Sequence, residues 1–442
     1  MRFNRLAILL ITIIVLTTLI VLVVQRYGDV CPIPLDPTVP VDADFDEQGV
    51  EDQDRPEFND FSWRVFVALN WPAKRGERGT ADVSKAFGSK ADQVVWESWP
   101  SVDHLFPKDP IITPPIRWEC LNEVDHVSIL DGDGKVTWYK APATAQQGNL
   151  SPCGLRLLGD LNQSGVSATD VISGKVVLPS PPLITQNKTY VRYEIRINRV
   201  AYDFVRCNEY FLGKTLSVLP PLPDGGGLAP SEFPVGSINV KAAWMELPAD
   251  ERIRERFYHV PAKVLDWNLD GNARWQEREM GLVGLHIVHK TPKRRNWIWS
   301  TFEQVDNVTP GPGACAASFS SLPGRIPDPI HSGKPLPDLT VPVQVIRSTN
   351  IDDQTKIIND RYHKYPQINN SVWRYYQLVA TQWPKKPGDQ DPKPGNFFPA
   401  PPVANAVIET SKDLRNASCL TCHRSSDIFQ FVFYPQMRAY LK

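Results

Sequence analysis

The sequence predicts an α+β fold: a β-rich, irregular body with short helices, a helical C-terminal segment and one N-terminal transmembrane helix. Three observations favour this class. Proline accounts for 41 of the 442 residues, and proline interrupts helices and central strands. Several segments in the middle of the chain alternate apolar with polar residues, which is the period of a half-buried strand. A long apolar run opens the chain.

The apolar run Leu6–Val24 contains no charged residue and follows two arginines. As a helix it spans roughly 28 Å, about the hydrocarbon thickness of a bilayer. Lys and Arg favour the cytoplasmic side, and an acidic stretch follows the run. We therefore expect residues 1–26 to be a cytoplasmic stub and lipid-embedded anchor, and residues 27–57 an acidic tether. The expected location is the bacterial inner membrane, single-pass, with the bulk facing the periplasm.

A cleaved signal peptide is the alternative interpretation of this run. The apolar region of a signal peptide is shorter and ends at a small-residue cleavage site. Residues Val23–Tyr27 offer no such site. We therefore expect the anchor to be retained.

The β-rich body is expected over residues 58–340. Asp60 is a suitable N-cap for a short helix over Phe61–Asn70. Further segments show strand signals, either alternation or a flanking turn rich in Asp and Gly. These predicted strands are Val127–Leu130, Lys135–Tyr139, Val191–Ile197, Ile238–Trp244, Gly281–His289 and Trp297–Phe302. Val191–Ile197 alternates most regularly, as a half-buried strand does.

The C-terminal region, residues 341–442, is expected to be more helical and to pack with the body. Val341–Arg347 has the composition of a strand, whereas Ser371–Gln382 and Val403–Arg415 have helical patterns. A proline-rich loop separates the two predicted helices.

The motif with the clearest chemistry is Cys419-Leu420-Thr421-Cys422-His423. C-x-x-C-H is the attachment signature of a c-type haem. The thiols of Cys419 and Cys422 form thioether links to the porphyrin, and His423 is the proximal iron ligand. The helical C-terminal segment is thus the predicted haem-attachment segment, holding one covalent haem c. A zinc half-site would need a second pair of ligands, and a redox CxxC belongs early in a βαβ unit.

The sixth iron ligand stays open at the level of sequence. Only 19 residues follow His423, so residues that precede the motif must cover most of the haem. The candidates are Met437 and His286, followed by His259, His289, His363, Met245 and Met280. His286 and His289 are on opposite faces of one predicted strand, so at most one points at a given site. A methionine ligand raises the reduction potential, whereas an open position permits chemistry at the iron.

Several segments resemble those of a sparsely characterised group of bacterial cytochrome c family proteins. The resemblance covers most of residues 58–442. It is carried by the segments Gly284-Leu285-His286-Ile287-Val288-His289-Lys290-Thr291-Pro292 and Trp297–Asn307, by Lys241–Trp244, Phe66–Pro72 and Gln377–Pro384, and by Ala404-Asn405 and Glu409-Thr410 ahead of the single C-terminal CxxCH. It implies an exported single-haem cytochrome, and it implies no substrate or reaction. The transmembrane helix is not carried over from the family.

Two function classes follow from this motif. The first is electron transfer in the periplasm, with redox partner proteins in the periplasm or inner membrane and no catalytic residue. The second is a haem-dependent oxidoreductase, peroxidase-like, that uses an open iron position. Whether the protein is an enzyme is therefore uncertain, with the carrier favoured. A formal net charge of −1 argues against nucleic acid as a partner.

Two weaker patterns complete the sequence. Asp266, Asn268, Asp270, Gly271 and Glu277 fit the spacing of a calcium loop, although an Asn/Asp/Gly turn explains the same residues. Calcium is therefore a possible but disfavoured ligand. An oxidising compartment favours disulfides, and Cys120 with Cys153 is a plausible local bridge. The remaining cysteines outside the motif are Cys31, Cys207 and Cys315.

Overall fold

A computed structural model describes most of the chain after residue 33. The described residues are 34–43, 55–121, 126–130, 136–141, 156–160, 183–212, 215, 232–267, 273–314, 316–319, 345, 347, 349–385, 397–400, 402–409 and 418–423. Pro37–Lys442 form one compact unit, and Met1–Asp36 form another. The account below concerns the first of these.

The fold is a β-rich mixed sheet with few helices, so the predicted fold class is wrong. The body is not irregular: it is built on one sheet of eight strands. Among the described residues no helix is long and apolar enough to cross a membrane. The segment expected to do so, Leu6–Val24, lies outside them. The predicted domain boundaries remain a prediction.

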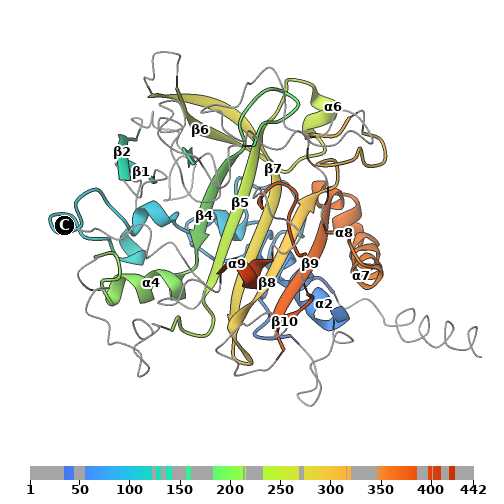
Figure 1. The fold of residues 1–442 in the computed structure, drawn as a ribbon, viewed down its shortest axis with the longest axis horizontal. Helices are drawn as coiled ribbons and strands as arrows, with labels where there is room; N and C mark the ends of the chain where they lie inside the picture. The colour runs from blue at the N-terminus through green and yellow to red at the C-terminus, as the bar shows by residue number, and fades with distance from the viewer. Residues whose placement is uncertain are drawn as a thin grey trace, which may run out of the picture. The chain divides into compact units, whose positions relative to one another are not determined.

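The eight-stranded sheet runs diagonally through the molecule (Figure 1). A path of six strands forms its main part, and all neighbours on this path are antiparallel. In spatial order the six are β10 (Phe397–Phe398), β9 (Tyr376–Pro384), β8 (Arg294–Gln304), β7 (Ala273–Thr291), β5 (Ile238–Glu246) and β4 (Arg192–Ile197). Two further strands, β6 (His259–Trp267) and β3 (Leu157–Leu158), pair with each other in parallel.

Strand β7 is long enough to take three partners. Its first half pairs with β6, and its second half pairs with β5 on one side and β8 on the other. Beyond β3, Asp160 accepts a backbone hydrogen bond of 3.0 Å from Tyr193 of β4. Hydrogen-bonded neighbours therefore form a ring of β7, β5, β4, β3 and β6, while β8, β9 and β10 extend the sheet beyond it.

Strand β4 is buried on both faces, which corrects the prediction of a half-buried strand. Its charged residues Arg192, Glu194 and Arg196 are only 2%, 6% and 7% exposed. They are buried in ion pairs: Arg196 Nε lies 2.9 Å from Glu194, and Arg156 Nε lies 2.9 Å from the other oxygen of Glu194. Burial of charged side chains requires such pairing. The alternating sequence therefore corresponds to two buried faces of the strand, one apolar and one charged.

One face of the sheet is covered by helices. Helix α2 (Arg55–Leu69) places Ser62 Oγ 2.7 Å from Ser300 Oγ of β8, and Trp63 stacks on Tyr362 of helix α7 (Asp353–His363) at 4.9 Å between ring centroids. We call this side of the strands β7, β8 and β9 the helical face. The opposite side, which we call the loop face, carries residues 402–409 and the short helix α9 (Cys419–His423). In Figure 1, α9 lies in front of the middle strands of the sheet, beside the label of β8.

Several predicted elements differ from the structure. Helix α2 begins at Arg55, so Asp60 is not its N-cap but lies within it, where its carboxylate accepts a hydrogen bond of 2.8 Å from Tyr362 Oη. Ser371–Gln382 is not a helix: a 3-10 turn, η5 (Val372–Tyr375), leads directly into β9. Pairing with β8 and burial on both faces override the helical spacing of this segment.

The region that leads to α9 also differs from its predicted helix. The described part of Val403–Arg415, up to residue 409, is an irregular loop. In Val341–Arg347 only residues 345 and 347 are described, and neither is in a strand. The other strand predictions are confirmed, including the separate hairpin of β1 (His126–Leu130) and β2 (Val136–Lys140).

Candidate haem-attachment site

The CxxCH residues form helix α9, which is docked on the loop face of the sheet. In a helix, positions i, i+3 and i+4 share one side, so positions 419, 422 and 423 lie on the same side of this turn. Leu420 is completely buried, and its backbone N–H donates a hydrogen bond of 2.8 Å to Gln382 Oε1 of β9. Leu420 thus anchors the helix to β9, the strand that was predicted to be a helix.

The imidazole of His423 lies against an indole of the sheet. The ring centroids of His423 and Trp299 are 4.6 Å apart, and their planes are inclined by 51°. Trp299 is on β8, opposite Gln382 of β9 in the strand register. Cys419 is 7% exposed. Two adjacent strands therefore hold the helix, one through a hydrogen bond and the other through an aromatic contact.

The loop 402–409, which precedes α9 in the chain, is fixed to the sheet through Asn405. The Asn405 side-chain amide donates to Thr301 Oγ1 at 3.0 Å and to the Phe302 carbonyl at 2.9 Å. Its oxygen accepts a hydrogen bond of 3.0 Å from the backbone N–H of Val407. Tyr193 of β4 donates from its hydroxyl to the Val407 carbonyl at 2.7 Å. These bonds join the loop to strands at both sides of β7.

A glycine lets this loop lie directly on β7. A Cβ at Gly284 would come within 2.8 Å of Val407 Cγ2 and 3.2 Å of Asn405 Oδ1. The first distance is shorter than real Cβ atoms show and the second is tighter than most of their contacts, so a larger residue would require a shift of the loop. The position of the loop 402–409 on the sheet therefore depends on the absence of a side chain at residue 284.

A histidine and a carboxylate meet where this loop ends. His286 Nε2 of β7 lies 3.3 Å from Glu409 Oε1. Burial alone would raise the pKa of Glu409, but the neighbouring His286, the backbone N–H of Asn405 and the Lys241 ammonium outweigh it, and the pKa is lowered. Lys241 of β5 is opposite His286 in the register. Its burial lowers the pKa of Lys241 to about 8, against the opposing charges of Glu409 and Asp160. The loop face thus carries an ionisable His–Glu–Lys cluster.

Strand geometry separates the two candidate histidines of β7. His286 is on the loop face with α9, whereas His289 is on the helical face, where its ring stacks on Phe61 of α2 at 5.6 Å. The expectation that at most one of them points at a given site is confirmed. Burial lowers the pKa of His289 to about 4, so its imidazole is neutral at pH 7.

The remaining sixth-ligand candidates are dispersed. His363 of α7 lies on the helical face and donates from Nε2 to the Tyr376 carbonyl at 2.8 Å, and His259 is paired with Glu279 at 2.6 Å. Met245 is enclosed in the apolar core that includes Val407 and Ile408, and Met280 is 1% exposed. Met437 lies outside the described residues.

The donor set of α9 fits a covalently bound haem. The positions for two thioether links and one imidazole ligand share one side of a single helical turn. This is the arrangement that c-type haem attachment requires. Trp299 and the buried Leu420 supply aromatic and apolar surroundings. No group of three His, Cys, Asp or Glu side chains that could hold a metal ion without a porphyrin occurs in the described part of the chain.

The calcium-loop residues are only partly described, and the two carboxylates at its ends are engaged with cations. Asp266, at the end of β6, forms an ion pair with Arg192, and Glu277 of β7 forms one with Lys263. In the register of β6 with β7, Glu277 is opposite Lys263, three pairs away from Asp266. The segment is the end of a β-hairpin and not a helix–loop–helix. Residues 268–272 lie outside the described part.

The predicted disulfide cannot be placed, because Cys153 lies outside the described residues, as do Cys31 and Cys315. Cys207, at the end of helix α4 (Arg199–Cys207), is an exposed cysteine outside any disulfide.

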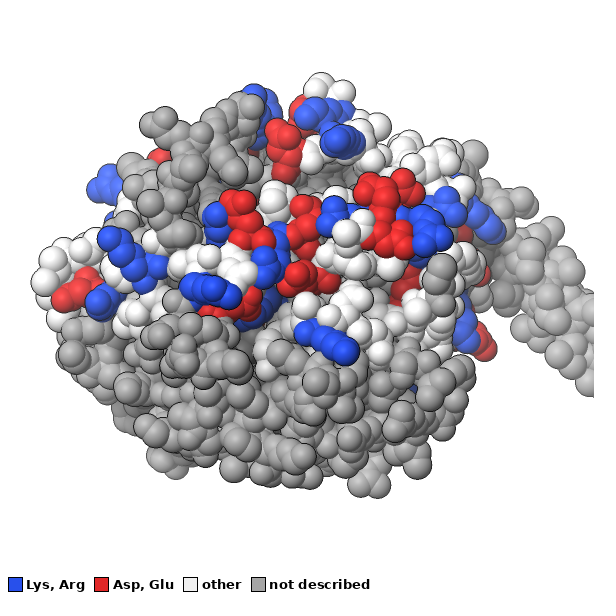
Figure 2. Space-filling view, turned by 90° about the horizontal axis from the view of Figure 1, so that it is seen from above, with Lys and Arg blue, Asp and Glu red and all other residues white. Residues whose placement is uncertain are grey.

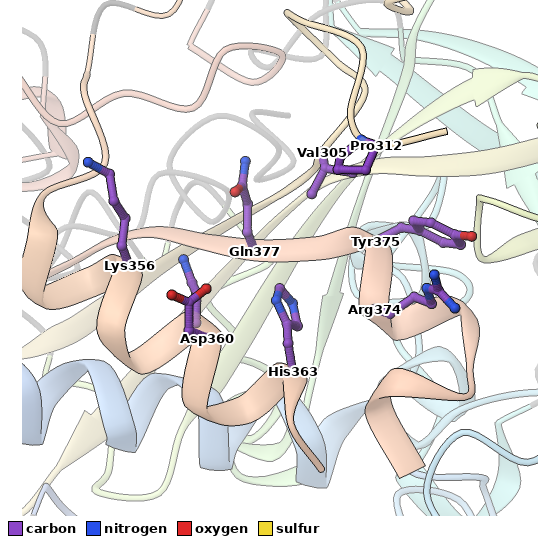
Figure 3. Close-up of a pocket in the computed structure, with 9 residues that line it drawn as sticks. Val305, Pro312, Lys356, Asp360, His363, Arg374, Tyr375 and Gln377 are labelled. Carbon is purple, nitrogen blue, oxygen red and sulfur yellow. The ribbon is translucent and has the colours of Figure 1, made fainter. Parts of the chain in front are cut away.

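Away from α9, the helical face has a hollow of about 310 Å³ beside α7, η5 and β9. Figure 3 shows Asp360 and His363 rising into it from α7, with Lys356 at one end and Arg374 at the other. Charges of both signs line it, so it does not select an ion of one sign. A similar mixture is seen on another side of the molecule in Figure 2, the view from above, where basic and acidic residues intermingle among the described residues.

Sequence reasoning missed the residues that contact the motif, Trp299 and Gln382, and two that fix the loop 402–409, Asn405 and Glu409. All four lie in the segments that carry the family resemblance, which was the available signal, although it assigned them no role. A scan of protein-family models and searches of curated proteins and of solved structures find no match to this chain.

Proposed function

We propose that this protein is an exported single-haem c-type cytochrome that transfers electrons in the periplasm. The observation that carries the proposal is the Cys419-Leu420-Thr421-Cys422-His423 motif, formed as one helical turn and docked on the loop face of the sheet. C-type haem attachment takes place outside the cytoplasm, which supports the exported location. Its partners would be redox proteins in the periplasm or inner membrane.

Each residue near the motif has a definable part in this proposal. Cys419 and Cys422 would form the thioether links, and His423 would be the proximal ligand. Gln382 holds the backbone of the helix, and Trp299 contacts the His423 ring, so both orient the ligand. Once bound, the haem supplies a one-electron iron couple. The protein controls its potential through the ligands and their surroundings.

The first experiment tests haem attachment. Cys419→Ala with Cys422→Ala, expressed in a host with the cytochrome c maturation machinery, should yield protein without haem peroxidase staining on a denaturing gel. The matched control is Cys207→Ala, which removes an exposed cysteine elsewhere and should retain the stain. Staining that persists in the double variant, or wild-type protein without a Soret band, would contradict the proposal.

A second candidate function is a haem-dependent oxidoreductase. The observation in its favour is the pair of His286 and Glu409 on the same face of the sheet as α9. A histidine held by a carboxylate is a usual general acid–base group. In an oxidoreductase this pair would move protons near an open iron position. In a carrier, His286 would either give up its contact with Glu409 and become the sixth ligand, or take no part.

One spectroscopic comparison separates the two functions. A six-coordinate low-spin spectrum that carbon monoxide does not change supports the carrier. A high-spin spectrum that changes with carbon monoxide or peroxide supports the enzyme. His286→Gln refines the test, because conversion from low spin to high spin in this variant would assign His286 as the sixth ligand. His259→Gln, an exposed residue of β6, is the matched control and should leave the spectrum unchanged.

A further inference from the structure

A second cavity, of about 400 Å³, lies beside the start of β5 and the end of β7. Its walls include two buried indoles, Trp99 and Trp118, which are 4% and 6% exposed. Gly79 also lines it and passes close to Trp99: a Cβ there would lie 3.0 Å from the indole Nε1, and φ is +76°. The close packing of glycine against the indole shapes this wall.

The rim of the cavity is apolar and exposed. Val41 is 70% exposed and Val235 51%, and both line the cavity. Val200 is 37% exposed, and it lies 4.0 Å from the position of a Cβ on Gly236, another lining residue. Exposed apolar side chains that gather around a concave site are typical of ligand-binding sites.

The two cations at the cavity are already engaged. Arg78 donates to the carbonyls of Trp118 and Leu121 at 2.5 Å and 3.1 Å. Arg199 forms ion pairs with Glu119 and Asp203. The charge of Arg199 is therefore compensated by carboxylates, and Arg78 has its donors on carbonyls and its guanidinium over the Trp118 ring. Neither guanidinium is free to bind an anion, so the cavity favours a neutral ligand.

One buried polar atom without a partner belongs to a side chain that lines the cavity. His289 lines it, is 4% exposed, and its Nδ1 has no hydrogen-bond partner among the described residues. A buried polar atom without a partner destabilises the folded protein. A hydroxyl group both donates and accepts, so it can pair with either tautomer of a neutral imidazole.

We propose that this cavity binds a small neutral aromatic alcohol of the phenol class, with its ring between the tryptophans and its hydroxyl at the His289 imidazole. An apolar cavity of about 150 Å³ holds benzene, so the larger volume here accommodates a substituted ring. Aromatic walls favour a planar aromatic body over an aliphatic one. This inference is independent of the haem, which the motif would place on the other face of the sheet.

Isothermal titration calorimetry of the full-length protein at pH 7 tests the proposal, with 4-methylphenol and toluene as the two probes. One hydrogen bond to the imidazole should make 4-methylphenol bind about tenfold more tightly than toluene. His289→Phe keeps an aromatic ring against Phe61 and should abolish this difference while toluene still binds. No binding of 4-methylphenol, or equal binding of the two probes to the wild-type protein, would overturn the proposal.

A second variant tests the location without altering the core. Val235 is half exposed at the rim, so Val235→Trp should narrow the entrance and weaken both probes at least tenfold. Ile357→Trp is the matched control, because Ile357 is 49% exposed on α7, and it should bind both probes like the wild type. Wild-type affinity in Val235→Trp would show that the probes bind elsewhere and would overturn the assignment of the cavity.

Discussion

The buried imidazole of His289 should make the stability of this protein depend on pH in a defined window. Burial lowers the pKa of His289 from 6.5 to about 4. Because the unfolded chain binds this proton more tightly than the folded protein does, stability is lost as the pH falls from about 6.5 to 4. A shift of this size corresponds to about 3 kcal/mol of unfolding free energy. Protonation of His289 removes this amount in full below pH 4, and it has no effect on the unfolding free energy above pH 6.5.

The assay compares the wild-type protein with His289→Phe, in which no proton can bind at this position. Urea denaturation at pH 7, 5.5 and 4.5, followed by tryptophan fluorescence, gives the unfolding free energy of each protein at each pH. Other groups titrate equally in both proteins, so their contribution cancels in the difference. Relative to the variant, the wild type should lose about 1.4 kcal/mol per pH unit in this window. Parallel pH profiles of the two proteins would refute the reasoning.

Two further predictions concern stability. Arg156 is 8% exposed and lies 2.9 Å from both Glu97 and Glu194. Arg156→Met leaves these two buried carboxylates without this cation, so it should lower the unfolding free energy by about 3–5 kcal/mol. Adding Glu97→Gln should recover part of this loss in the same urea assay, and no recovery would show that charge is not the cause. Gly284→Ala should lower the unfolding free energy by about 1–3 kcal/mol, because its methyl group would press on Val407 and Asn405. Residues 402–409 should also become more sensitive to proteolysis, and resistance equal to that of the wild type would contradict the prediction.

Part of the fold and of the site could be predicted from local sequence. Strand β5, the pairing of β7 with β8 and the hairpin of β1 with β2 were predicted correctly, because period-2 alternation and short turns act between neighbouring residues. The same periodicity predicted that His286 and His289 point to opposite faces. The CxxCH pattern, which carries the proposed function, is also a purely local signal.

Other features depended on residues far apart in the chain. The helical spacing of Ser371–Gln382 was overridden because β8 offers a pairing edge and α2 covers the resulting strand. The charged residues of β4 were taken for a solvent-facing pattern. They are buried by distant partners: Arg196 donates to the carbonyls of Glu97 and Trp99, almost a hundred residues away. Local spacing contains no information about such partners.

By itself, the sequence determined the chemistry that α9 can present: two cysteines and a histidine in one turn, whatever lies around them. Only the tertiary structure decided which side chains share that face. Tyr193 and Val407 are 214 residues apart, yet their hydrogen bond helps to hold the loop that places Glu409 beside His286. The physical reason is that alternation along a strand separates its two faces without specifying what covers either one. The covering segments are chosen by long-range packing and hydrogen bonding over the whole sheet.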